Sequence, residues 1–62
     1  MTSKLRDARE KKGWSQAKLA EKARVSRATI SALENQRAST MKTTTLTKLA
    51  DALGEKVTSL FF

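Results

Sequence analysis

Apolar residues in this chain recur at intervals of three and four positions, the spacing that gathers them on one face of a helix. The clearest stripe is Leu46, Leu49, Ala50 and Leu53, which predicts an amphipathic helix that ends at Gly54. Threonines 43–45 precede the stripe, and one of them is expected to cap the helix. The pattern predicts an all-α fold.

The same spacing predicts three shorter helices upstream, each introduced by a serine that can cap its first turn. They run over residues 3–12, 16–24 and 27–35, with Ser3, Ser15 and Ser26 as the N-caps. Two glycines, at 13 and 54, follow the first and the fourth of these helices and are expected to stop them. Helices this short and this closely joined must cross steeply.

The remaining segments are a connection and a tail. Residues 35–42 are polar and lack apolar periodicity, which predicts a loop. The tail, residues 57–62, leaves two alternatives: a final helical turn, or a strand that pairs with a second subunit. Because no linker or repeat divides the chain, we expect residues 1–62 to form one domain.

Charge narrows the possible functions. Lysine and arginine number 13 against 6 carboxylates, giving a net charge of +7, and ten of the cations lie in residues 1–37. A chain this basic is attracted to polyanions, of which nucleic acid is the usual one, although basic charge also serves solubility. The longest apolar run is residues 60–62, far short of the roughly 20 residues that span a bilayer, so we expect a cytoplasmic protein with no membrane anchor.

Catalysis is not expected. The chain has no cysteine and no histidine, which excludes disulfides, thiol nucleophiles and a histidine base, and argues against a metal or other cofactor. Asp51 and Glu55 lie one helical turn apart, but no base, metal-ligand cluster or phosphate loop accompanies them. We expect solvated surface carboxylates and no enzyme.

Residues 15–35 form the pattern of a helix-turn-helix unit. Ala20 is small where the two helices would cross, Val25 can fill the turn, and Ile30 with Leu33 can hold the second helix to the core. At 100° per residue, small side chains and one cation occupy the opposite face of that helix. This face consists of Arg27, Ala28, Ser31 and Ala32.

That face suits the major groove of DNA, where small side chains let a helix backbone approach the bases. Arg27 can bond to the O6 and N7 atoms of guanine, Ser31 to various base edges, and Ala28 and Ala32 can touch thymine methyl groups. The plainer alternative is that the alanines are good helix formers and the arginine is solvated.

The starts of the two helices offer contacts that do not depend on DNA sequence. Free backbone N–H groups behind Ser15 and Ser26 carry partial positive charge and can bind a phosphate, and Gln16 adds an amide donor. The alternative is that both serines act only as caps. The two roles are compatible, because phosphates bind where capped helices begin.

Several motifs together resemble the lambda-repressor-like helix-turn-helix family of phage repressors and Cro proteins. They are residues 13–16 (Gly-Trp-Ser-Gln), 19–20 (Leu-Ala), 25–31 (Val-Ser-Arg-Ala-Thr-Ile-Ser), 33–35 (Leu-Glu-Asn) and 49–54 (Leu-Ala-Asp-Ala-Leu-Gly). The resemblance covers nearly the whole chain. It implies five helices, a third helix in the major groove, and a homodimer that reads a near-palindromic operator in a bacterial or phage-encoded, nucleoid-associated protein.

The resemblance also implies residue roles. Gln16 would hold a phosphate, Asn35 and Arg37 would contact the DNA backbone, and Arg9 would pair with Glu34 between helices. The base-facing set would again be Arg27, Ala28, Ser31 and Ala32. The chain departs from the family pattern at Lys18, which replaces a glutamate, and at Arg24 and Gln36, which replace glycines.

These features support a sequence-specific transcriptional regulator, most simply a repressor. A second hypothesis is an antitoxin that binds a toxin protein and represses its own operon, because residues 13–16 and the threonine-rich run 43–47 resemble antitoxins that partner kinase-like toxins. A third is an interaction adaptor that keeps the fold without using DNA. The charge and the small-residue face argue against the adaptor.

The three residues Leu60, Phe61 and Phe62 are the candidate dimer interface. Exposed, they would form a large apolar patch for so small a chain, which pairing of two tails would bury. The alternative is that they fold back onto Leu53 and Trp14 and close the core. Phe62 is the stronger interface candidate of the three.

Overall fold

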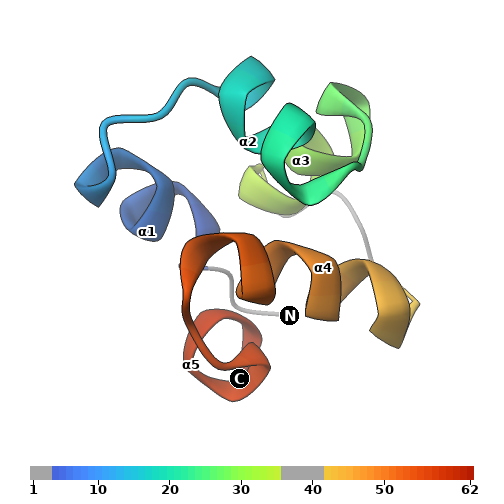
Figure 1. The fold of residues 1–62 in the computed structure, drawn as a ribbon. Helices are drawn as coiled ribbons and strands as arrows, with labels where there is room; N and C mark the ends of the chain where they lie inside the picture. The colour runs from blue at the N-terminus through green and yellow to red at the C-terminus, as the bar shows by residue number, and fades with distance from the viewer. Residues whose placement is uncertain (1–3, 36–41) are drawn as a thin grey trace.

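The computed structural model describes residues 4–35 and 42–62, and these residues form five α-helices and no strand. In order the helices are α1 (Leu5–Lys11), α2 (Gln16–Ala23), α3 (Arg27–Glu34), α4 (Thr43–Leu53) and α5 (Val57–Phe61). The predicted all-α class is confirmed, and the ambiguous tail is a helix. In Figure 1, α4 lies between α5 on one side and the α2 and α3 pair on the other.

Two of the predicted serine caps are confirmed, at the starts of α2 and α3. The Ser15 hydroxyl accepts the Lys18 backbone N–H at 3.0 Å, and the Ser26 hydroxyl accepts that of Thr29 at 3.1 Å. The predicted cap Ser3 lies outside the described residues. The helix α1 begins at Leu5, and its N-cap is Lys4, whose side chain makes no capping hydrogen bond.

The predicted threonine cap of α4 is wrong. Lys42 is the N-cap, and its side chain makes no capping hydrogen bond. The three threonines instead form the first turn of the helix. Lys42 holds the N-cap position through its extended backbone and not through a side-chain hydrogen bond. The sequence pattern could not distinguish this start from a hydroxyl cap one residue later.

Three helices end with a residue in the left-handed conformation. Gly13, predicted to stop the first helix, follows α1 with φ 70°, and its N–H and that of Trp14 bond to the carbonyl groups of Glu10 and Arg9. Gly54 closes α4 with φ 68°, and its N–H and that of Glu55 bond to the carbonyl groups of Asp51 and Ala50, the Schellman pattern. Arg24 closes α2 with φ 59°, and its N–H and that of Val25 both bond to the Ala20 carbonyl. A side chain in this region costs roughly 1 kcal/mol relative to glycine, so the turn of the helix-turn-helix unit carries strain.

The core draws on all five helices. Its largest fully buried side chains are Leu5, Leu19, Ile30, Leu49 and Phe61. The stripe on α4 faces this core as predicted, and Trp14 and Val25 pack against its edge. The Lys4 N–H donates to the Leu60 carbonyl at 2.8 Å, which joins the start of α1 to α5.

This packing corrects the predicted exposed patch. Leu60 and Phe61 are 3% and 1% exposed, because α5 turns its apolar face onto α1 and α4. They close the core of a single chain. Among residues 4–35 and 42–62, Phe62 is the one large hydrophobic residue that is exposed, at 82%.

Candidate nucleic-acid interface

The helices α2 and α3 pack against each other across a three-residue turn and form the helix-turn-helix unit. Ala20 and Val25 are partly buried against the core, where the helices cross and turn. Ile30 and Leu33 are buried and hold α3 in place. The local sequence therefore fixes which face of α3 points outward.

The four predicted base-facing residues lie on that outward face. Arg27 and Ala28 are exposed, and Ser31 and Ala32 are partly exposed. Arg27 stands in the first turn of α3, where no acidic side chain is present to neutralise it. The surface combines short side chains with one cation, which allows the backbone of α3 to approach a partner closely.

Asn35, predicted to contact the DNA backbone, begins the segment after α3. Its Nδ2 donates to the Ser31 carbonyl at 2.8 Å and lies 3.3 Å from the Ser31 hydroxyl. These bonds close the end of α3 and orient the Ser31 side chain. Arg37, the other residue in this role, lies outside the described residues, as does Gln36.

The starts of α2 and α3 are both open to an anion. Neither helix has an acidic residue in its first turn, and the serine caps satisfy one backbone N–H each. Ser15 and Ser26 are exposed. The remaining first-turn N–H groups keep their partial positive charge at the surface.

Gln16 connects the start of α2 to the end of α3. Its Nε2 donates to Glu34 Oε1 at 3.2 Å, an interaction that the sequence did not predict. One amide N–H of Gln16 is occupied in this way, and within the described residues the second has no acceptor. The bond fixes Gln16 beside the free N–H groups of the helix start.

A buried ion pair joins α1 to α3 behind this surface. Arg9 donates from Nε to Glu34 Oε2 at 2.8 Å and from Nη2 to Oε1 at 3.1 Å. Its Nη1 also donates to the Trp14 carbonyl at 2.6 Å. The side chains of Arg9 and Glu34 are 12% and 0% exposed, so the pair that the family resemblance implied is present and desolvated.

The ion pair shifts the pKa of both Arg9 and Glu34. Burial alone would raise the pKa of the Glu34 carboxyl, but hydrogen bonds from Arg9 and Gln16 outweigh burial, and the pKa lies below its ordinary value. The hydrogen bond to Glu34 raises the pKa of Arg9. Both groups stay charged near neutral pH.

Arg6 is a part of this cluster that the sequence reasoning missed. Its Nε lies 3.3 Å from Glu34 Oε1 and its Nη2 lies 3.4 Å from Asn35 Oδ1, while the side chain remains 52% exposed. Arg6 precedes Arg9 by three residues, so both lie on one face of α1. That spacing was the available signal.

Neither a metal-ligand cluster nor a membrane-spanning helix is found in the described part of the chain. Residues 4–35 and 42–62 contain no cluster of acidic side chains that could hold a metal ion. No helix among them is long and apolar enough to cross a membrane.

Comparison with known proteins agrees with this geometry. No curated protein matches the chain. A family model described as helix-turn-helix matches residues 5–60, a span that includes α1 through α4 and most of α5. The chain belongs to the lambda-repressor-like helix-turn-helix family and carries the DNA-binding domain of a transcription regulator.

Proposed function

We propose that this protein is a repressor that binds a near-palindromic operator as a homodimer, with residues 1–62 acting as one domain. The observation that carries the proposal is the outward face of α3: small side chains and one arginine on a helix held rigidly by Ile30, Leu33 and the buried pair of Arg9 and Glu34. A rigid helix with this face fits the major groove.

Each predicted side chain has a role in this proposal. Arg27 bonds to guanine, Ser31 bonds to a base edge, and Ala28 and Ala32 contact thymine methyl groups. Phosphate contacts fix the register of the helix. The residues assigned to phosphates are Ser15, Gln16, Ser26, Asn35 and Arg37.

The homodimer is assigned to the surface around α5. Phe62 is the exposed apolar residue of this region, and a second copy related by two-fold symmetry would cover it. Leu60 and Phe61 support such an interface from inside, because they fix the position of α5. Occupation of an operator that overlaps a promoter would then block transcription.

Selection of bound sequences from random duplex DNA tests the proposal. Carried out at about 150 mM salt, which limits nonspecific binding, it should recover a motif with two-fold symmetry and a measurable half-site spacing. Recovery of no motif, with weak binding that vanishes as salt rises, would contradict sequence-specific reading.

The antitoxin alternative is supported by the start of α4, where Thr43, Thr44 and Thr47 are exposed and free of the core. In this alternative a toxin protein would bind there while α3 still reads the operator. Co-purification with the product of a neighbouring gene, lost on changing these threonines to glutamate, would favour it. A chain that represses its operator without any such partner would count against it.

A further inference from the structure

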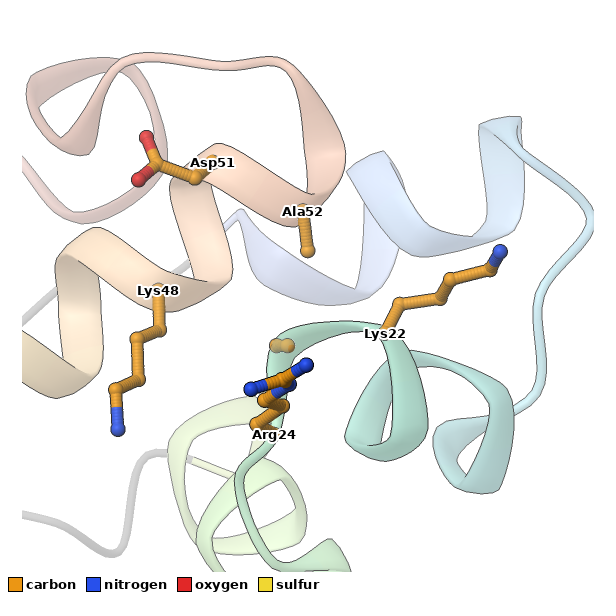
Figure 2. Close-up of a pocket in the computed structure, with 6 residues that line it drawn as sticks. Lys22, Arg24, Lys48, Asp51 and Ala52 are labelled. Atoms are coloured by element: carbon orange, nitrogen blue, oxygen red, sulfur yellow. The ribbon is translucent and has the colours of Figure 1, made fainter.

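A hollow of about 340 Å³ lies between α2 and α4, beside the turn that leads into α3 (Figure 2). Small apolar side chains and charged side chains line it. The lining residues are Lys22, Ala23, Arg24, Lys48, Asp51 and Ala52. None of them belongs to the surfaces assigned above to DNA or to the dimer, so the hollow has no role in the proposed function.

Three cations surround this hollow without partners. Within the described residues, Lys22, Arg24 and Lys48 form no hydrogen bond or ion pair through their side chains. In Figure 2 they follow one another across the hollow, Lys48 on α4, Arg24 in the middle and Lys22 on the far side. The two lysine side chains extend away from each other. The three cations are therefore spread along the hollow, an arrangement that suits an extended ligand.

Arg24 is unusual in its backbone conformation as well as in its charge, which is unpaired among the described residues. Its left-handed conformation is one that glycine would adopt at lower cost, yet the position presents an exposed guanidinium. Local strain of this kind is typical of functional positions. A guanidinium is a planar fork of donors that matches a carboxylate with two parallel hydrogen bonds.

The other lining residues favour polypeptide over nucleic acid. Ala23 and Ala52 give the hollow an apolar floor that accepts an apolar side chain. Asp51 lies at its edge and pairs with no cation among the described residues, so its carboxylate can accept an N–H group from a peptide main chain, a donor that a phosphate backbone lacks. A chain that alternates carboxylates with apolar side chains complements this surface.

We propose that the hollow between α2 and α4 is a docking surface for an acidic, extended segment of a partner protein. Arg24 pairs with one carboxylate of the segment, Lys48 and Lys22 attract the charges on either side, and an apolar side chain rests on the two alanines. The proposal does not depend on operator binding, because the surface is separate from the outward face of α3.

A titration of the full chain, followed by amide chemical shifts at low salt, tests this directly. The probe is a short synthetic peptide in which leucine alternates with glutamate. It should shift the amides of residues 22–25 and 48–53, and the same peptide with glutamine for glutamate should not. Shifts scattered over basic residues of every helix would overturn the proposal. So would shifts of these amides by duplex DNA but not by the peptide.

Matched variants make the test specific. Arg24→Gly removes the guanidinium and relieves the backbone strain, so it keeps the fold, and it should weaken peptide binding about tenfold. Lys48→Gln should weaken it in the same direction. Lys11→Gln is the control, because Lys11 is an exposed lysine on α1 that does not line this hollow. Equal losses in the Arg24→Gly and Lys11→Gln variants would reduce the binding to general charge and overturn the proposal.

Discussion

Arg9 binds Glu34 through two parallel hydrogen bonds of 2.8 and 3.1 Å, and the Glu34 side chain is entirely removed from solvent. The pair joins α1 to the last turn of α3. Arg6 and Gln16 reach the same carboxylate, so three helices meet at one buried charge. The orientation of α3, and therefore of its outward face, depends on this charge being compensated.

Removal of Arg9 should be strongly destabilising. In Arg9→Met the carboxylate of Glu34 stays buried without its main partner, at a cost of about 3 kcal/mol or more in the free energy of unfolding. A domain of this size has little more than that in total. Urea denaturation followed by circular dichroism measures the loss.

Arg6→Met is the matched control, because Arg6 bonds to the same carboxylate from a half-exposed position. It should cost less than about 1 kcal/mol. Equal losses in the Arg9→Met and Arg6→Met variants would show that burial of the pair does not determine its importance.

Stability should fall in acid through Glu34. Its pKa is lower in the folded chain than its usual value of 4.5, so its contribution is fully present above that pH. The contribution is lost as pH falls through the folded-state pKa. Denaturation midpoints recorded between pH 7 and pH 2 should decline for the parent and decline less for Glu34→Gln. Identical acid profiles for the two proteins would rule out Glu34 as a cause.

Arg24→Gly should stabilise the chain by about 0.5 to 1 kcal/mol, because glycine adopts φ 59° without the steric cost. Arg24→Ala separates backbone strain from charge, since it removes the guanidinium but keeps the strained conformation. The melting temperature from thermal unfolding should be higher for Arg24→Gly than for the parent, and for Arg24→Ala it should be close to that of the parent. A similar increase for both variants would assign the effect to charge instead.

Arg27→Ala should cost about 1 to 3 kcal/mol of binding free energy on the cognate operator and relax the preference at one base-pair position. The loss should be small on unrelated DNA. Fluorescence anisotropy with a set of single-position operator variants measures both effects. An equal loss on every sequence would instead make Arg27 a phosphate contact.

Phe62→Ser should weaken self-association without unfolding the chain, because Phe62 is exposed. Sedimentation equilibrium reports the dimer constant. Phe61→Ala is the contrasting variant and should cost about 3 kcal/mol or more of stability, since it empties a core position. A dimer constant unchanged in Phe62→Ser would move the interface elsewhere.

Much of the fold could be predicted because helix periodicity, serine caps and glycine stops are local signals. Ser15, Ser26 and Gly54 act as their types indicate. The prediction of a threonine cap was wrong because the apolar spacing of α4 does not fix its first residue. The helix can begin at Thr43, with Lys42 as N-cap, or after one of the threonines. The tail was ambiguous because an apolar run can bury itself or a partner, and only packing shows that Phe61 lies inside.

The site was predictable in part for the same reason. The outward face of α3 follows from spacing once Ile30 and Leu33 face the core. The links from Arg6 and Gln16 to Glu34 join residues 28 and 18 positions apart. The spacing of Arg6 and Arg9 places both arginines on one face of α1, but no local pattern shows that Glu34 packs against that face. The pair of Arg9 and Glu34 was expected only through the family resemblance, because sequence alone does not show that a charge is buried.

The most direct test of the account is the affinity for a selected operator relative to a scrambled duplex, measured across a range of salt concentrations. Sequence reading by α3 predicts that the operator binds at least about 10³-fold more tightly near physiological salt, and that part of this preference persists as phosphate contacts weaken. Equal affinities that fall together as salt rises would contradict it.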